Sequence, residues 1–410
     1  MLDALVIGAG AAGIAAARRL SELRQRYAIV EAKAFAGGRA LTDNATFGVP
    51  VDLGAHWLHT PDQNPLKAWA DALGVRYLQR AYATRYSLGS AWLSDEETSA
   101  CADYIERCFA AIDVHGSTGV DRAVSDLLDE AGPWAGAFAA EFAAKQGVTP
   151  REASTLDFAR YLWDGDDLPV VGGFGNLVAR LAEGTELTTV CTVSRIDHAR
   201  ADAVRIETSR GDIEARAVIL TVSTGVLRDS IAFDPRLPGW KRAAIEDLPM
   251  GSCNKVALRF ERDVFGGLRD CLVLPQRGAV EAVEFVLRPD GRDIAVCLVN
   301  GPFGRDLAGA GGDAMRDYAL ERLCEIFGSA VRGAVAPERV CVDWDRDPCA
   351  RGSFSAALPG GADAREALAL PVDDRIYFAG EATHPHFMGD VHGAWLSGVD
   401  AVEALTGATA

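Results

Sequence analysis

The feature that most constrains this chain is a glycine-rich turn close to its start. Residues 2–7 form a short apolar run that predicts a buried strand, and Gly8-Ala9-Gly10-Ala11-Ala12-Gly13 follows directly. An alanine-rich stretch from Ile14 to about Arg24 predicts a helix, and a second strand is expected from Tyr27 to Val30. Strand, glycine turn, helix and strand in this order predict a dinucleotide-binding α/β unit.

Each part of this unit has a physical role toward a dinucleotide. Gly8 permits a tight turn, Gly10 lets a pyrophosphate approach the backbone, and Gly13 lets the helix pack closely on the strand. Free N–H groups at the helix start then hold the phosphates. Glu31 ends the second strand, where a carboxylate accepts hydrogen bonds from an adenosine ribose. A lone glycine pattern also occurs in unrelated α/β turns, but the full ordered series favours a nucleotide site.

Composition and charge limit the class of protein. The chain has 410 residues, 49% of them apolar and 24% charged, as expected of a soluble globular protein with one large domain or two interleaved ones. Its apolar runs are broken well before the roughly 18 residues of a membrane span, and we expect no targeting leader before the first strand. The net charge of −17 disfavours nucleic acid as a partner and favours cationic ligands, although acidic surfaces also serve solubility.

Cysteine and histidine patterns give no indication of a bound metal. The nine cysteines are scattered and contain no C-x-x-C, which argues against a disulfide framework or a zinc site and predicts a cytoplasmic protein. His384, His386 and His392 are close in sequence, but a metal site would need a further ligand of compatible geometry. Positions in loops near a cofactor are the preferred interpretation. His115 and His198 are expected at the surface.

A second glycine turn indicates which dinucleotide is bound. Gly37-Gly38-Arg39 follows the second strand within a few residues, so a second glycine turn at Gly38 can bring the cation of Arg39 to the same pyrophosphate. This arrangement resembles FAD-binding proteins of the glutathione-reductase type. Later blocks make the chain similar, nearly end to end, to the flavin amine oxidases, the family of monoamine oxidases, polyamine oxidases and histone lysine demethylases. The block Gly54-Ala55-His56-Trp57-Leu58-His59 is most similar to the polyamine oxidases.

The resemblance implies contacts to FAD along the chain. The loop with His56 and Trp57 passes beside the flavin, and His59 points into the substrate tunnel. An ordinary hydrogen-bonded loop histidine is the simpler interpretation of His56. The other implied contacts are Val193 at the adenine, Trp344 near the flavin ring, Gly380 and Glu381 at the ribityl chain, and the backbone N–H of Val391 at a flavin carbonyl.

Lys255 has two interpretations. The resemblance implies a lysine at this position that holds a water against flavin N5. A buried lysine has a lowered pKa and can assist proton movement. The alternation Val-Ala-Leu-Arg-Phe that follows equally fits a solvent-facing lysine on a strand. The surrounding motif favours the functional interpretation.

Three positions bear on the substrate and on flavin attachment. Phe354 falls where the family has one wall of an aromatic cage for the amine, but Asp390 replaces the aromatic residue of the second wall. A carboxylate beside the reacting nitrogen would favour the ammonium form, which cannot assist hydride loss. Ser353 matches the cysteine that binds flavin covalently in monoamine oxidases, so we expect non-covalent FAD.

The middle of the chain carries aromatic and acidic residues with an open interpretation. Trp134, Tyr161 and Trp163 would fit a substrate pocket, but aromatic side chains are more often buried for core packing. Residues 164–167, Asp-Gly-Asp-Asp, are interpreted as a solvated turn. If this turn reached a pocket mouth, it would attract a diamine or polyamine.

The predicted fold is α/β with two interleaved parts. Residues 1–75, 170–235 and 345–410 are expected to form a discontinuous, Rossmann-like FAD-binding domain of the glutathione-reductase type. Residues 76–169 and 236–344 are expected to form a smaller, mixed α+β substrate-binding domain. The ligand site would lie between the two domains.

The substrate-binding part is expected to combine a helical first insert with strands in the second. The second insert also carries a flexible glycine-rich loop before a helix, and a further helix ends the chain. The expected bounds are strands at 254–260, 284–288 and 294–299, the loop at 308–312, and helices at about 313–327 and 394–405.

The implied activity is oxidation of a small-molecule amine, either a polyamine or another primary or secondary amine. A hydride passes from the α-carbon to flavin N5, the imine hydrolyses to an aldehyde plus an amine or ammonia, and O2 becomes hydrogen peroxide. One alternative is an FAD-dependent desaturase or oxidase of a carotenoid- or porphyrinogen-type substrate, against which Lys255 and the His59 loop speak. Another is a non-catalytic FAD-binding scaffold, supported only by Asp390. The sequence leaves the oligomeric state open.

Overall fold

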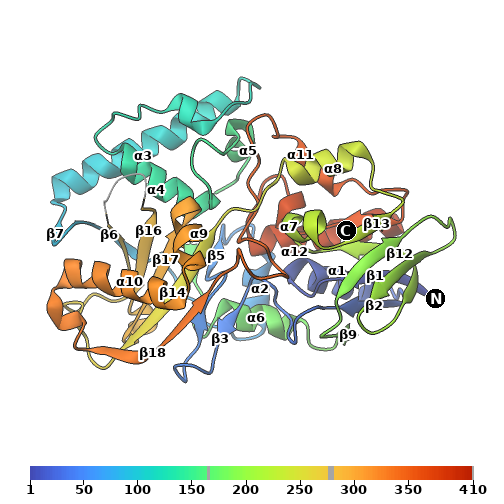
Figure 1. Ribbon diagram of the computed structural model, residues 1–410, viewed down its shortest axis with the longest axis horizontal. Coiled ribbons are helices and arrows are strands. Elements are labelled where there is room, and N and C mark those ends of the chain that lie inside the picture. Colours follow the sequence, from blue (N-terminus) through green and yellow to red (C-terminus); the bar gives the residue numbers. More distant parts are fainter. Residues whose placement is uncertain (164–166, 276–280, 409–410) are drawn as a thin grey trace.

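The structure, a computed structural model, describes residues 1–163, 167–275 and 281–408. These residues build two large sheets, one in the half of the molecule where both termini lie and one in the opposite half (Figure 1). Two short ribbons join loops near the middle. They pair β3 (Thr42–Asp43) with β4 (Val51–Asp52), and β5 (Trp57–His59) with β8 (Asp167–Pro169).

The first sheet has a parallel centre. Its described strands run in the order β13-β10-β11-β12-β1-β2-β9, and β19 also pairs with β12. The apolar run predicted as a buried strand is β1, which lies in parallel register between β12 and β2. The strands are β1 (Leu2–Ile7), β2 (Tyr27–Val30), β9 (Leu187–Thr188), β10 (Val193–Asp197), β11 (Val204–Thr208), β12 (Ile213–Leu220), β13 (Ala232–Asp234) and β19 (Ile376–Phe378).

Small side chains let two helices pack tightly on one face of this sheet. A Cβ added at Gly398 would lie 2.1 Å from the carbonyl oxygen of Ala12, so α12 (Val391–Thr406) passes α1 (Ala11–Glu22) at backbone contact. Both helices begin earlier than the sequence predicts. The other helices of this half are α2 (Pro65–Ala72), α6 (Phe174–Leu181), α7 (Thr224–Asp229), α8 (Gly239–Glu246), α11 (Ala364–Ala369) and the short η4 (Glu381–Thr383).

The second sheet is mostly antiparallel, in the order β18-β14-β17-β16-β15-β6-β7. Successive side chains on a strand point to opposite faces. On β14, Val256 and Leu258 therefore pack toward one hydrophobic core, while Ala257 belongs to a second core on the other face. The strands are β6 (Ala83–Leu88), β7 (Ala91–Trp92), β14 (Cys253–Phe260), β15 (Cys271–Pro275), β16 (Val283–Leu287), β17 (Ile294–Asn300) and β18 (Val335–Val342).

Helices pack against both faces of the second sheet. The long α10 packs its apolar residues Met315, Ala319 and Leu323 on one face. The helices from the middle of the chain lie on the other side, where α4 contacts β16 and β17 (Figure 1). The helices are α3 (Asp95–Gly116), α4 (Ala135–Gln146), α5 (Thr155–Ala159), α9 (Gly301–Gly309), α10 (Gly312–Phe327) and the short η1 (Val124–Leu127), η2 (Pro289–Gly291) and η3 (Ser329–Val331).

Four local predictions are wrong. His392, expected in a loop, is the second residue of α12 and is buried. The loop expected at 308–312 is mostly helical, because α9 continues to Gly309 and α10 begins at Gly312. The first insert is not only helical, since its strand β6 pairs in parallel with β15. His198 is buried rather than at the surface: its Nε2 donates to the Pro235 carbonyl oxygen at 2.8 Å and its Nδ1 faces Asp373.

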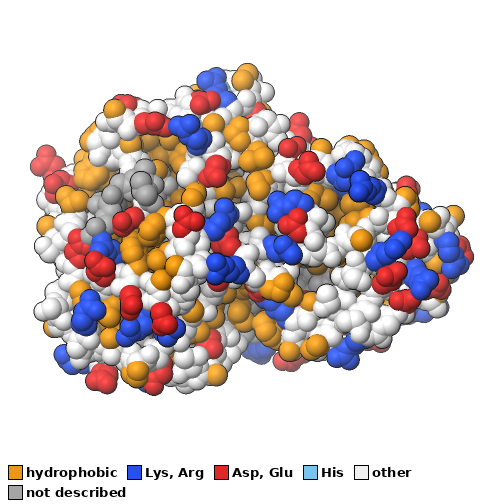
Figure 2. Space-filling model, in the orientation of Figure 1, with side chains coloured by type: hydrophobic (Ala, Val, Ile, Leu, Met, Phe, Trp, Pro, Cys, Tyr) orange, Lys and Arg blue, Asp and Glu red, His pale blue; other side chains and the backbone are white. Residues whose placement is uncertain are grey.

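The surface of the molecule is mixed in charge. On the face shown in Figure 2, acidic and basic side chains are interspersed, so the net charge of −17 is not concentrated in one patch there. Among the described residues, no helix is both long and apolar enough to cross a membrane.

Candidate active site

A cavity of about 920 Å³ is lined by loops of the first sheet and by strands of the second. Its size lies at the upper end of small-molecule sites in proteins. Nearly all the site residues predicted from sequence line it. They are Gly8, Gly10, Glu31, Gly38, Arg39, His56, Trp57, His59, Val193, Lys255, Trp344, Phe354, Gly380, Glu381, Asp390 and Val391.

The remaining predicted residue, Gly13, serves the packing beneath the cavity. A Cβ at this position would lie 1.9 Å from the carbonyl oxygen of Gly8, so only glycine lets α1 approach the first turn. Gly8 itself has φ +106°, a conformation that favours glycine. The first and third glycines are thus required by the protein's own backbone.

Gly10 is different, because the protein around it leaves space. Apart from its chain neighbours, the nearest atom to an added Cβ would be the Gly38 Cα, at 4.0 Å. The second glycine turn packs directly against the first, since the Gly37 N–H donates to the Ala9 carbonyl oxygen at 2.8 Å. The two turns therefore form one open backbone cradle at the start of α1, which suits a pyrophosphate.

Three further predicted cofactor contacts line the same cavity. Glu31 follows β2 and accepts hydrogen bonds from the backbone N–H groups of Ala9, at 2.7 Å, and Lys33, at 2.8 Å. Val193 begins β10 at the cavity. Trp344 is buried, and its indole N–H donates to the Leu53 carbonyl oxygen at 3.3 Å. These hydrogen bonds hold the side chains of Glu31 and Trp344 in place at the cavity.

Glu381 lines the cavity and is held there by two cations. Burial alone would raise the pKa of Glu381, but the Arg39 and Arg365 guanidinium groups outweigh it and lower this pKa. Arg39 donates to Glu381 at 2.9 Å. Arg365 reaches it through Ser355, whose hydroxyl donates to Glu381 at 2.7 Å. Asp157 balances the buried Arg365 with two hydrogen bonds, at 2.7 and 2.9 Å.

Lys255 lies inside the molecule. It is 4% exposed and its ammonium donates to the Gly54 carbonyl oxygen at 2.5 Å. Burial lowers the pKa of Lys255. The alternation of β14 does place Lys255 on one sheet face, but that face borders the cavity instead of solvent.

A row of side chains crosses the second sheet from Lys255. Lys255 on β14 pairs with Leu298 on β17, and Leu298 pairs with Glu284 on β16. These three residues share a face and line the cavity. Strand spacing separates the Lys255 and Glu284 backbones by roughly 10 Å. The row therefore places an acid at a defined distance from the lysine.

Glu284 is a buried acid whose carboxylate has, in the part of the chain described, no hydrogen-bond or ion-pair partner. It is 9% exposed, and burial raises its pKa to about 7 against the opposing effect of Lys255. Glu141 on α4 also lines the cavity, and burial raises its pKa as well. Glu106 and Asp113 on α3 are exposed residues of the same lining, so they lie where the cavity meets solvent.

His59 lies between two carboxylates. Its Nδ1 pairs with Asp167, and its Nε2 is 3.9 Å from Oδ1 of Asp390. Burial opposes the charged imidazole, but both carboxylates outweigh it and raise the pKa of His59 to about 9. Asp390 also accepts a hydrogen bond from the Tyr161 hydroxyl at 2.8 Å. Burial raises the pKa of Asp390 to about 6, despite the opposing effect of His59.

Other predicted positions have ordinary structural contacts as well. His56 bonds to the Tyr82 hydroxyl at 2.9 Å and faces Asp52, and burial lowers its pKa. Ser353 exchanges hydrogen bonds with the backbone of Cys253. Phe354 stands beside Gly389, where an added Cβ would lie 3.7 Å from the Phe354 Cβ. The aromatic ring and Asp390 therefore border the same part of the cavity.

The core interpretation holds for one of the three aromatic residues in the middle segment. Trp134 packs against a hydrophobic cluster. Trp163 is 49% exposed and lines the cavity under the Lys145 ammonium, which is 4.3 Å from the ring centre. Tyr161 also lines the cavity. Of the predicted turn 164–167, residues 164–166 lie outside the described residues, and Asp167 belongs to β8.

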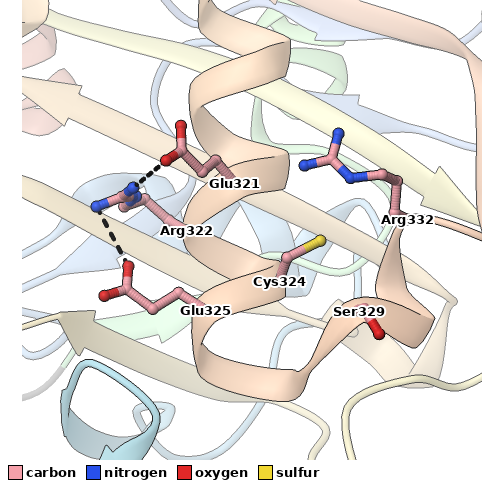
Figure 3. A pocket seen from close by; sticks show the side chains of 6 residues that line it. All are labelled: Glu321, Arg322, Cys324, Glu325, Ser329 and Arg332. Carbon is pink, nitrogen blue, oxygen red and sulfur yellow. Dashed lines mark ion pairs between the residues drawn. The ribbon is translucent and has the colours of Figure 1, made fainter.

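A second hollow, of about 460 Å³, lies at the end of α10 (Figure 3). The Arg322 guanidinium there forms ion pairs with Glu321 and Glu325. Its other lining residues are Cys324, Ser329 and Arg332. None of the predicted site residues lies in this hollow.

Several cavity residues were missed from the sequence. Glu284, Glu141 and Lys145 line the cavity, and Arg365 supports its wall. A signal exists for Glu284, because it is an acid inside an otherwise apolar strand, Val-Glu-Phe-Val-Leu. The local sequence around Arg365 carries no comparable signal.

The first sheet and its glycine turns define a dinucleotide-binding α/β protein. Strands of the second sheet complete the lining of the same cavity. A family model described as flavin containing amine oxidoreductase matches residues 79–406, and an NAD(P)-binding Rossmann-like domain model matches residues 6–73. The chain belongs to the flavin-containing amine oxidoreductase family.

Individual relatives are similar over nearly the whole chain. Probable polyamine oxidase 4 of Arabidopsis thaliana is 27% identical, covering 97% of this chain and 85% of that protein. Lysine-specific histone demethylase 1 homolog 1 of Oryza sativa subsp. japonica is 28% identical, covering 96% of this chain and 51% of that protein.

Solved structures share the fold. A triple mutant of putrescine oxidase with redesigned cofactor binding superimposes with a TM-score of 0.81 at 20% identity, covering 98% of each chain. Cyclohexylamine oxidase from Brevibacterium oxydans IH-35A gives a TM-score of 0.79 at 19% identity, again covering 98% of each chain. The predicted fold class and family are confirmed. The protein is an FAD-dependent enzyme that oxidises amines.

Proposed function

We propose that the substrate is an aliphatic diamine or polyamine, with O2 as the electron acceptor and hydrogen peroxide as the product. The observation that carries this proposal is the buried carboxylate of Glu284, which has no hydrogen-bond or ion-pair partner among the described residues and lies in the same cross-strand row as Lys255. A buried anion is costly unless a cation compensates it. A second ammonium group on the substrate supplies that cation.

The lining supports non-covalent FAD at the other end of the cavity. The space beside Gly10 fits a pyrophosphate against bare backbone, and Glu31 borders it as an acceptor. Arg39, Glu381 and the start of α12 at Val391 would hold the rest of the cofactor. A serine at position 353 has no sulfur with which to form a thioether. When bound, FAD supplies the acceptor for the hydride of the amine.

The other residues would bind and orient the amine. Glu284 and Glu141 hold the distal ammonium, and Phe354 packs against the carbon chain near the reacting end. Lys255, kept inside the cavity wall by its hydrogen bond to Gly54, orients a water molecule or moves a proton. Exposed Glu106 and Asp113 attract the cation at the entrance.

The two sheets support a division of labour within the chain. The described strands of the first sheet all fall within 1–75, 170–235 and 345–410, which we assign to FAD binding. Those of the second sheet fall within 76–169 and 236–344, which we assign to substrate binding. The acidic lining of the second part speaks against a carotenoid- or porphyrinogen-type apolar substrate.

Replacing Glu284 tests the proposed substrate class. We expect Glu284→Gln to raise the KM for a diamine by about 30-fold or more, equivalent to about 2 kcal/mol, because the distal ammonium loses its buried counter-charge. Below pH 7 the wild-type carboxylate takes up a proton, so its KM for the diamine should also rise as the pH falls. Steady-state peroxide formation measures both effects.

A monoamine of the same chain length is the matched substrate control. It lacks the second ammonium, so its KM should change less than threefold on Glu284→Gln. The exposed acid Glu338 on β18 provides a matched variant, Glu338→Gln, for which we expect no change with either substrate. An equal loss for diamine and monoamine would contradict the proposed role of Glu284.

A further inference from the structure

The second wall of the expected amine cage is a carboxylate in this chain, and its surroundings are specific. Asp390 precedes α12, is 9% exposed and lines the cavity beside Phe354. Its Oδ2 accepts the Tyr161 hydroxyl at 2.8 Å. Its Oδ1 lies 3.9 Å from Nε2 of His59.

The gap between His59 and Asp390 is too long for a hydrogen bond. At 3.9 Å the two atoms are too close for a third atom to lie on the line between them, but an atom to one side of this line can be within hydrogen-bond distance of both. A substrate nitrogen placed there would contact both groups at once. His59 is held on its other side by Asp167, and the side chains of His59 and Asp167 are 30% and 29% exposed, respectively.

The chemistry of the reaction requires a proton acceptor at this point. An aliphatic amine is an ammonium ion at neutral pH, like the lysine side chain with its pKa of about 10.4. The nitrogen lone pair must be free when the α-carbon loses its hydride. The bound substrate therefore has to lose one proton first.

We propose that Asp390 is the residue that removes this proton from the bound ammonium. The inference rests on the proposed amine substrate. An N–H bond of the ammonium breaks, the proton joins Oδ1 of Asp390, and the nitrogen keeps the electron pair. The neutral carboxylic acid holds this proton while the hydride leaves and then releases it to water. The iminium left by hydride loss is itself a cation, and water hydrolyses it directly to the aldehyde and an ammonium ion.

The neighbours of Asp390 prevent it from simply trapping the ammonium. An isolated carboxylate would stabilise the charged amine, as expected from sequence. Here the His59 imidazolium faces the same space and disfavours a second cation. His59 is a positioning residue, and the Tyr161 hydroxyl fixes the carboxylate.

The charge state of Asp390 depends on groups from several elements. Burial raises its pKa to about 6, which makes it a stronger base than an ordinary aspartate. Its protonated form increases as the pH falls through 6, so the wild-type rate should fall there. The titratable groups that face or influence it are His59 on β5, Asp167 on β8, Tyr161 after α5, Glu381 on η4 and His392 on α12.

The pH dependence of flavin reduction tests this role. With saturating diamine and no oxygen, we expect Asp390→Asn to reduce the flavin about 100-fold more slowly than wild type at pH 7. The two proteins should converge within about fivefold at pH 10, where solution deprotonates the amine. Asp390→Glu should keep most of the neutral-pH rate. A loss that is equal at every pH would overturn the proposal, because misplacement alone has no pH dependence.

Infrared difference spectra give a second readout that needs no turnover. The ligand is an amine without an α-hydrogen, bound to the FAD-loaded protein at pH 7.5. We expect a carboxylic acid C=O band to appear in wild type and in Glu284→Gln, and to be missing in Asp390→Asn. Absence of the band from wild type would refute proton transfer to Asp390. If no amine reduces the wild-type flavin, the proposed substrate class fails and this inference falls with it.

Discussion

Single buried charges define the chemistry of the cavity. Lys255 and Glu284 are both almost fully buried, and they lie two strands apart on one face of the second sheet. Burial shifts the pKa of each toward the neutral form. Charged residues are rarely enclosed in this way unless they are paired or functional.

Lys255 provides the first residue-scale prediction. We expect Lys255→Met to retain FAD but to slow turnover by about 100-fold, because the cavity loses the group that orients water or moves a proton. Flavin absorbance measures the bound cofactor, and peroxide release measures turnover. Lys67→Met, at a partly exposed lysine on α2 away from the cavity lining, is the control and should be unchanged. Turnover of Lys255→Met within threefold of wild type would contradict the proposed role.

At the residue scale, the sequence was sufficient to predict site residues that lie within one short, continuous motif. Gly8, Gly10 and Glu31 occur in one continuous unit, and the structure brings them together at the cavity. The burial of Lys255 was not predictable from alternation, which tells which residues share a face but not what covers that face. The prediction that His198 lies at the surface was wrong for the same reason. Residues 234–235 and Asp373, which are distant in the chain, enclose its side chain.

The glycine turns act as one element with two distinct requirements. Gly13 is needed where α1 meets the first turn, whereas Gly10 leaves space toward the cavity. The same small residue therefore serves the protein's packing at one position and, in our proposal, the ligand at the other.

These requirements predict opposite effects of adding one methyl group. Gly13→Ala should lower the free energy of unfolding of the FAD-free protein by about 1–3 kcal/mol, because its Cβ overlaps the Gly8 carbonyl oxygen. Gly10→Ala should leave that stability unchanged and remove most of the rise in Tm produced by added FAD. Thermal unfolding with and without FAD distinguishes the two. Normal FAD stabilisation of Gly10→Ala would argue against a pyrophosphate at this turn.

A buried ion pair ties α5 to α11. Arg365 and Asp157 are 1% and 3% exposed, and Arg365 also contacts Ser355 beside Glu381. Arg365→Met should destabilise the protein by about 3–5 kcal/mol in urea unfolding, because it strands the Asp157 charge. Arg205→Met, which breaks the exposed pair with Asp212, should cost less than about 1 kcal/mol. Similar losses of unfolding free energy for both variants would show that burial of the Arg365–Asp157 pair adds nothing to stability.

At the element scale, strands with a regular apolar pattern were predictable from the sequence. Strands and helix ends that depend on contacts with distant segments were not. The strands near 254–260 and 294–299 were found because apolar residues recur along them. Strand β6 was missed because its sequence, Ala-Thr-Arg-Tyr-Ser-Leu, has few apolar residues and is stabilised by pairing with the distant β15. The prediction of a loop at 308–312 was wrong because the glycines of this segment lie at the ends of two helices, whose positions tertiary packing fixes.

For the molecule as a whole, the cavity depends on segments that are far apart in the chain. The glycine turns come from the first 40 residues, the Lys255–Glu284 row from the middle, and Glu381 and Asp390 from the end. The family resemblance predicted that these segments meet, but periodicity alone could not. The acids on α3 and α4 were missed because only the closed fold turns those helices toward the cavity.

The most direct test of the account is anaerobic mixing of the FAD-loaded protein with amines while the flavin absorbance is recorded. The series contains linear diamines, spermidine and a monoamine of matched length. We predict bleaching by a diamine or polyamine at a concentration at least tenfold below that needed for the monoamine. No bleaching by any of these amines, with a flavin that dithionite still reduces, would contradict the proposed substrate class.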